Sequence, residues 1–158
     1  MKLRSALILA GCIALVAVVS VTGSMATLPK IPGWYAQLAK PSFTPPNSVF
    51  PIAWTTLYFL MALSLWRLIE SPVSTARTRA IAFFLVQLAL NAAWSWVFFH
   101  FESTRGGLIV IAALWLMIAV TIFACSKVSR LAAWLLVPYL MWVTFATLLN
   151  AEIVRMNP

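Results

Sequence analysis

The sequence predicts an all-α membrane protein, a bundle of five transmembrane helices. Hydrophobic residues fill 63% of the 158 positions and charged residues only 9%, whereas about a quarter of the residues of a soluble domain are charged. The charged residues flank five uncharged apolar stretches, each near or above the roughly 20 residues that cross a ~30 Å hydrocarbon core. Backbone groups find no water there, so helices are expected.

The predicted spans and their turns use nearly the whole chain, which leaves room for a single domain over residues 1–158. We expect the five helices at about residues 5–25, 47–66, 80–101, 106–126 and 131–151.

One connection is long, over residues 26–46, and holds Pro29, Pro32, Pro41, Pro45 and Pro46. Proline disfavours continuous helix, although residues 33–39 could form a short one. The aromatic residues of this segment argue against a disordered linker. We interpret it as a lid over one end of the bundle; a belt of Trp and Tyr at the lipid headgroups is the alternative.

The first stretch has two interpretations. Lys2 and Arg4 precede it and Ser24-Met25-Ala26 resembles a cleavage site, as in a signal peptide. Its apolar run over residues 5–21 exceeds the usual 7 to 15 residues of such a signal. We therefore expect a retained first helix.

The charge pattern predicts orientation rather than nucleic-acid binding. The eleven Lys and Arg give a net charge of +8 but form no dense stripe. Seven fall on one face of the predicted topology: Lys2, Arg4, Arg67, Arg77, Arg79, Lys127 and Arg130. Four fall on the other: Lys30, Lys40, Arg105 and Arg155. The positive-inside rule then places the N-terminus in the cytoplasm of a multi-pass protein surrounded by lipid.

No metal site is predicted. Cys12 and Cys125 lie inside spans without a neighbouring Cys or His, and His100 is the only histidine.

Several separate positions carry a family resemblance. In the long connection and second span they are Trp34-Tyr35, Leu38, Lys40-Pro41, Pro45-Pro46, Trp54 and Leu57-Tyr58. In the third and fifth spans they are Leu88 to Asn91, Trp94, Phe98-Phe99, Val137 to Trp142, Phe145-Ala146 and Leu149-Asn150. In this order they resemble the TspO/MBR family, the tryptophan-rich sensory proteins that include the mitochondrial translocator protein.

Helical spacing groups many of these side chains into stripes of aromatic and small or polar residues. The candidate ligand-binding residues are Trp34, Tyr35, Trp54, Tyr58, Gln87, Asn91, Trp94, Pro138, Trp142 and Ala146. Buried amides in lipid are costly, so Gln87 and Asn91 should face the bundle interior. Their alternative role is only to join helices.

Aromatic walls with a few amides and hydroxyls suit a planar, mostly apolar ligand. The resemblance implies protoporphyrin IX or a haem-like tetrapyrrole, isoquinoline and benzodiazepine drugs and, in some members, cholesterol; no cofactor is required. Lys30 and Lys40 would attract porphyrin propionates. Ala151 stands where the family's sterol pattern needs Tyr between Leu149 and Arg155, which makes tight cholesterol binding doubtful.

Three function classes remain: a protein that binds tetrapyrrole for sensing or handling, a transmembrane transporter, and a membrane scaffold. Glu70, Glu102 and Glu152 all lie at span ends, which disfavours proton-coupled transport. The small residues Ala89 and Ala93 predict a homodimer contact on the third helix.

Conventional enzyme chemistry is not predicted, because no triad, metal cluster or carboxylate pair is present. The resemblance implies light- and oxygen-dependent breakdown of porphyrin. Trp54 and Trp142 match the family's reactive tryptophans; plain packing is their alternative role.

Overall fold

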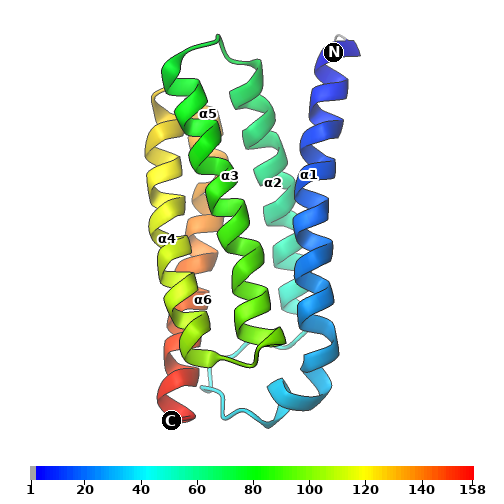
Figure 1. Ribbon diagram of the computed structural model, residues 1–158, viewed down its shortest axis with the longest axis vertical. Helices are drawn as coiled ribbons and strands as arrows, with labels where there is room; N and C mark the ends of the chain where they lie inside the picture. Colours follow the sequence, from blue (N-terminus) through cyan, green and yellow to red (C-terminus); the bar gives the residue numbers. More distant parts are fainter. Residues whose placement is uncertain (1–2) are drawn as a thin grey trace.

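The computed structural model describes residues 3–158, which form an elongated bundle of five helical segments long and apolar enough to cross a membrane (Figure 1). Residues 3–158 contain no strand. In chain order the elements are α1 Leu3–Thr27, the 3-10 turn η1 Leu28–Lys30, the π-helical turn η2 Ile31–Tyr35, α2 Val49–Glu70, α3 Thr75–Ser95, the π-helical turn η3 Trp96–His100, α4 Thr104–Ser126, α5 Arg130–Leu135 and α6 Val137–Met156. The predicted fold class is confirmed.

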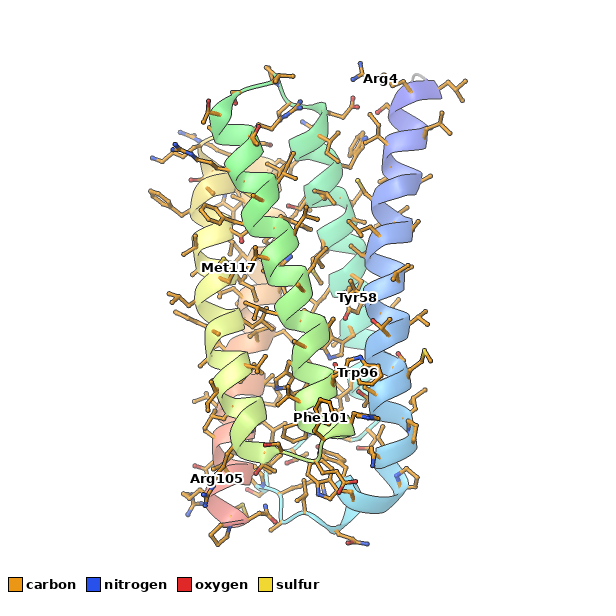
Figure 2. The ribbon with its side chains drawn as sticks, in the orientation of Figure 1. Arg4, Tyr58, Trp96, Phe101, Arg105 and Met117 are labelled. Atoms are coloured by element: carbon orange, nitrogen blue, oxygen red, sulfur yellow. The ribbon has the colours of Figure 1, made fainter. Side chains whose placement is uncertain are left out.

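The chain runs up and down, so its two termini lie at opposite ends of the bundle (Figure 1). We call these the N-terminal end and the C-terminal end. Figure 2 shows Arg4 at the first and Arg105 at the second, with Tyr58 and Met117 between them. The membrane side of each end remains a prediction, and Lys2, which contributes to it, lies outside the described residues.

Three serines fix helix starts that hydropathy alone misplaces. The side chain of Ser74 accepts a hydrogen bond from Arg77 N, that of Ser103 from Gly106 N, and that of Ser129 from Ala132 N. Such caps satisfy backbone donors that the first helical turn leaves free. Helix α3 therefore begins at Thr75, five residues before the predicted start at residue 80, because its polar first turn stays helical outside the apolar span.

The predicted loop over residues 26–46 is wrong in its first half. Helical turns continue from α1 through η1 and η2 to Tyr35. Pro29 and Pro32 each occupy one of the first two positions of a short helix, where the missing N–H costs nothing. The irregular connection is residues 38–48, and it crosses the C-terminal end of the bundle (Figure 1).

The fifth span, predicted as one helix over residues 131–151, consists of α5 and α6. The break falls at Leu136, where the backbone has φ −93° and ψ −10°. Pro138 lies in the first turn of α6 and has no N–H to donate to the carbonyl four residues earlier.

The buried side chains form two groups. The larger fills the bundle from its N-terminal end and includes Cys12 and Val16 of α1, so the first helix is part of the core. The smaller, which we call the end cluster, lies at the C-terminal end and consists of Tyr35, Phe98, Phe99, Leu149 and Ile153.

Candidate ligand cavity

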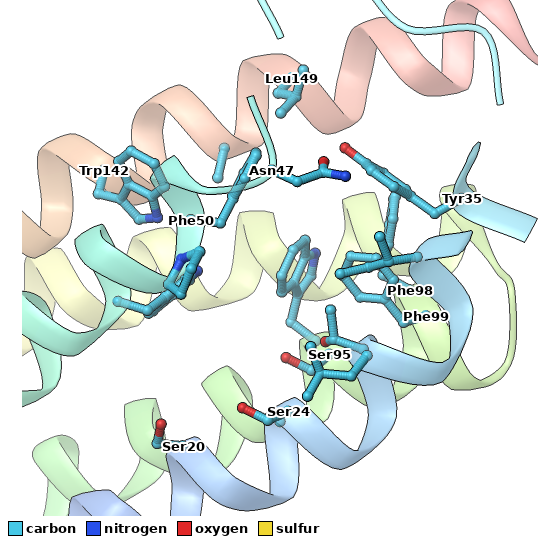
Figure 3. A pocket seen from close by; sticks show the side chains of 18 of the residues that line it. Ser20, Ser24, Tyr35, Asn47, Phe50, Ser95, Phe98, Phe99, Trp142 and Leu149 are labelled. Carbon is cyan, nitrogen blue, oxygen red and sulfur yellow. The ribbon is translucent and has the colours of Figure 1, made fainter. Parts of the chain in front are cut away.

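A cavity of about 280 Å³ lies between the helices in the C-terminal half of the bundle (Figure 3). Its walls come from α1 with η1 and η2, from the start of α2, from the junction of α3 and η3, and from α6. All five residues of the end cluster line it, so they form its floor at that end of the bundle.

One wall of the cavity is aromatic. The rings of Phe50 and Trp142 meet edge to face, with centroids 5.9 Å apart. Trp54 packs against Tyr58 at 5.5 Å on the same helix. These rings come from α2 and α6, and their flat, polarisable faces suit a planar ligand.

The facing wall carries hydroxyl groups. Ser20, Ser24 and Thr27 of α1 line the cavity together with Ser95 of α3. Figure 3 shows Ser20 and Ser24 across the cavity from Trp142 and Phe50. Among residues 3–158, none of those that line the cavity is Asp, Glu, Lys, Arg or His. The site therefore offers hydrogen bonds and stacking but no ion pair.

Buried amides position the aromatic side chains. Tyr58 Oη donates to Asn91 Oδ1 at 2.8 Å, and Asn91 Nδ2 donates to Tyr139 Oη at 2.9 Å. This chain of hydrogen bonds joins α2, α3 and α6 behind the wall.

A second amide acts closer to the floor. Asn150 Oδ1 accepts from Trp94 Nε1 at 3.3 Å, while its Nδ2 donates to the carbonyl of Thr104 at 2.9 Å. Paired amides of this kind are tolerated in an apolar bundle because every polar atom finds a partner.

Trp142 differs from these paired groups. Its Nε1 is buried and has no hydrogen-bond partner within residues 3–158. A buried donor without a partner carries a desolvation cost.

The structure brings six of the ten sequence-predicted site residues to the cavity wall. They are Tyr35, Trp54, Tyr58, Trp94, Trp142 and Ala146.

The other four lie elsewhere. Trp34 packs edge to face on Phe98, with centroids 5.5 Å apart, and does not line the cavity. Gln87 is fully buried, and its side-chain amide nitrogen and oxygen have no hydrogen-bond partner in the described part of the chain. Asn91 lies behind Tyr58, where it joins helices as the alternative interpretation expects.

Two properties of a helix explain these differences: the distance between residues along its axis, and the gradual rotation of residues spaced four apart. Gln87 lies seven residues from Trp94, roughly 10 Å along the axis at 1.5 Å per residue, so sharing a face does not place both at one site. Steps of four residues also turn by ~40° relative to a helix face. Pro138 and Ala146 therefore lie on different faces of α6. Pro138 lines a second groove, between α2 and α6, with Leu57 and Met141.

Sequence reasoning missed the hydroxyl wall and much of the floor. The signal was present: Ser20, Ser24 and Thr27 recur at helical spacing within an otherwise apolar span. Leu149 and Asn150 were positions of the family resemblance but not candidate site residues, while Ser95 and Ile153 carried no comparable pattern.

The two lysines near the cavity are both engaged. Lys30 Nζ lies 2.7 Å from Glu102 Oε1. Lys40 Nζ lies 4.7 Å from the centre of the Tyr35 ring and donates to the carbonyl of Leu38 at 2.9 Å. Lys40 thus sits against the outer side of a ring that lines the cavity.

The fold and this cavity define a multi-pass membrane protein with an uncharged, aromatic internal site. The sequence model of the TspO/MBR family matches residues 12–156. The chain belongs to the TspO/MBR family.

Relatives agree with this assignment. The "Tryptophan-rich protein TspO" of Chlorobaculum tepidum is 40% identical over 98% of this chain and 99% of its own. The "Tryptophan-rich sensory protein" of Cereibacter sphaeroides is 44% identical over 78% of this chain and 77% of its own. The human "Translocator protein" is 37% identical over 78% of this chain and 75% of its own.

Proposed function

We propose that this protein binds a planar, largely apolar ligand, protoporphyrin IX or a related tetrapyrrole, in the cavity between α1 and the aromatic residues of α2 and α6. The observation that carries the proposal is an uncharged cavity walled on one side by Phe50, Trp54 and Trp142. Stacking on such rings is worth about 0.5–1.5 kcal/mol per pair beyond area burial.

The cavity volume constrains how the ligand sits. About 280 Å³ is at the lower end of the ~300–1,000 Å³ typical of small-molecule sites. An isoquinoline- or benzodiazepine-sized drug matches this space better than a whole four-ring macrocycle. We expect the macrocycle to insert part of its plane and to leave its propionates outside, since no cation lines the cavity.

Tryptophan fluorescence tests this proposal. Titrating protoporphyrin IX into the purified protein should quench fluorescence with saturation. Trp142→Leu should weaken binding by about two- to tenfold, the loss of one stacking face. Trp134→Leu is the matched control, because Trp134 is 70% exposed and remote from the cavity lining. Equal weakening in both variants would contradict the placement of the ligand.

Light-dependent breakdown of the bound porphyrin is a second candidate function. Trp54 and Trp142 both line the cavity, so either indole would lie beside a bound ring. Illumination with oxygen should then consume bound porphyrin in the wild-type protein and more slowly in Trp54→Phe and Trp142→Phe. Equal rates in all three proteins would refute a role for these indoles.

Two relatives are named a sensory protein and a translocator protein, so sensing and transport are the two uses of the cavity that we compare. We favour sensing or handling over transport, because Glu70, Glu102 and Glu152 lie at or near helix ends and none lines the cavity. Protoporphyrin flux across liposomes above that of empty vesicles would reverse this preference. By the positive-inside rule we assign the cavity end of the bundle to the non-cytoplasmic side.

A further inference from the structure

The cavity has one exposed margin. Apart from the partly exposed Trp142, its lining residues on η3 and α6 are buried; Phe98, Asn150 and Ile153 are each at most 2% exposed. By contrast, α1 with η1 contributes the exposed residues Ser24 and Leu28. The start of α2 contributes Asn47, Pro51 and Thr55, which are also exposed. The cavity therefore reaches the surface at the edge between α1 and α2.

The packing of α1 explains this edge. Toward the N-terminal end α1 lies on α2, where Trp66 Nε1 donates to Ser5 Oγ at 3.1 Å. Toward the C-terminal end it lies on α3 and η3, where a Cβ on Gly23 would be 3.3 Å from Ser95 Oγ. Helix α1 thus packs on α2 in one half of the bundle and on α3 and η3 in the other. In the half that contains the cavity, α1 and α2 are therefore not packed against each other.

This edge lies within the membrane-spanning part of the chain. Thr55 is six residues inside the span Val49–Glu70, roughly 9 Å along the axis from Val49. Ser24 lies inside the span Leu3–Tyr35. Of the exposed margin, Ser24, Leu28, Pro51 and Thr55 therefore lie inside candidate membrane spans, and Asn47 lies just outside the span of α2.

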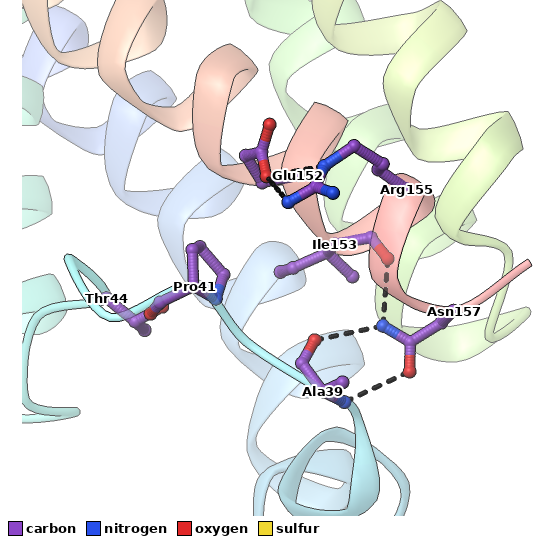
Figure 4. Close-up of polar contacts among 7 residues, drawn as sticks. All are labelled: Ala39, Pro41, Thr44, Glu152, Ile153, Arg155 and Asn157. Atoms are coloured by element: carbon purple, nitrogen blue, oxygen red, sulfur yellow. Dashed lines mark hydrogen bonds and ion pairs between the residues drawn. The ribbon is translucent and has the colours of Figure 1, made fainter.

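The end of the bundle, by contrast, is closed. The end cluster fills it, with Tyr35 only 7% exposed. The side-chain amide of Asn157 holds the connecting loop in place: Asn157 Nδ2 donates to the carbonyl of Ala39 at 2.9 Å, and Ala39 N donates back to Asn157 Oδ1 at 3.0 Å (Figure 4). On the other side of this end, Lys30 pairs with Glu102.

We propose that the ligand enters and leaves the cavity laterally, from the bilayer, through the edge between α1 and α2. The inference rests on the proposed function. It narrows the ligand class to planar molecules that dissolve in lipid and carry hydrogen-bond acceptors. The hydroxyls of Ser24 and Thr27, together with Thr55 across the edge, offer donors to such a molecule as it passes.

The test compares rates rather than affinities. Thr55→Phe places a ring in the edge between α1 and α2. Thr56→Phe is its matched control, because Thr56 is the next residue, is also exposed, and does not line the cavity. Asn157→Ala frees the loop at the closed end. Each protein is reconstituted in phosphatidylcholine vesicles, and protoporphyrin IX binding and release are followed by stopped-flow tryptophan quenching.

Thr55→Phe should slow both association and release by about tenfold, as expected for a raised barrier to passage. Thr56→Phe and Asn157→Ala should stay within about twofold of the wild-type rates, a free-energy change near 0.4 kcal/mol. Slower release is diagnostic, because simple damage to the cavity wall would speed release.

Two outcomes would overturn the inference separately. Quenching in the wild type with unchanged rates in Thr55→Phe, or with release accelerated by Asn157→Ala alone, would refute the lateral route and favour the end of the bundle. Absence of any saturable quenching in the wild type would instead refute the proposed function, and the route with it.

Discussion

Gly107 of α4 offers the sharpest test of how the cavity floor is packed. A Cβ at this position would lie 2.7 Å from Phe98 Cδ2, 3.0 Å from Phe98 Cβ and 3.1 Å from Asn150 Oδ1. Real Cβ atoms do not approach so closely, so Gly107→Ala must displace Phe98 or Asn150, and both line the cavity.

The expected change in stability follows from comparing Gly107→Ala with a matched variant, Gly11→Ala. Overpacking typically costs about 1–3 kcal/mol, while replacing glycine by alanine in a helix gains up to about 1 kcal/mol. Gly11 of α1 is also helical, and no atom that the structure describes lies within 4 Å of the position that a Cβ would take. Gly11→Ala should therefore gain only the propensity contribution, and the difference between the two variants, about 1–3 kcal/mol, isolates the packing contribution.

The assay is unfolding in mixed detergent micelles, followed by helical circular dichroism and repeated with a saturating isoquinoline-type drug. Gly107→Ala should unfold at a lower denaturant concentration than Gly11→Ala and bind the drug more weakly. Equal shifts in both variants, or drug binding unchanged in Gly107→Ala, would refute the close contact between α4 and the floor.

Three further predictions concern polar contacts, each measured by the same unfolding assay. Tyr139→Phe removes the partner of Asn91 Nδ2 and should destabilise by about 1–3 kcal/mol, the cost of an unsatisfied buried donor; a neutral result would show that the amide finds another partner. Glu102 has a positive φ of 54°, so Glu102→Gly should relieve backbone strain of about 1–3 kcal/mol and offset the lost ion pair with Lys30, worth about 0–1 kcal/mol. A loss of stability larger than that of Lys30→Gln would contradict this. Ser74→Ala removes the cap of α3 and should cost about 0.5–2 kcal/mol, whereas the exposed Ser48, which makes no cap hydrogen bond, should tolerate alanine.

The sequence by itself determined the class of fold. Hydropathy placed all five spans, because a ~30 Å apolar layer leaves the backbone little choice beyond helices of that length. Boundaries were less well predicted, since a polar first turn such as that of α3 remains helical once Ser74 caps it. The prolines led to a wrong prediction of a loop from residue 26. Pro29 and Pro32 lie at the starts of short helices, where they do not interrupt the helical path to Tyr35.

The sequence also pointed to Trp54, Tyr58 and Trp142, because the family resemblance includes these positions and helical spacing places Trp54 and Tyr58 on one face of their helix. The sequence could not show how far along the helix axis the cavity lies. Gln87 and Trp94 share a face of one helix, yet only Trp94 reaches the cavity.

Only the tertiary structure decided where the cavity reaches the surface of the bundle. That depends on α1 leaving α2 to pack on α3, through the close approach of Gly23 to Ser95. A single glycine in an apolar span has no sequence signal for its partner, because the contact joins residues 72 positions apart and is set by how whole helices fit together.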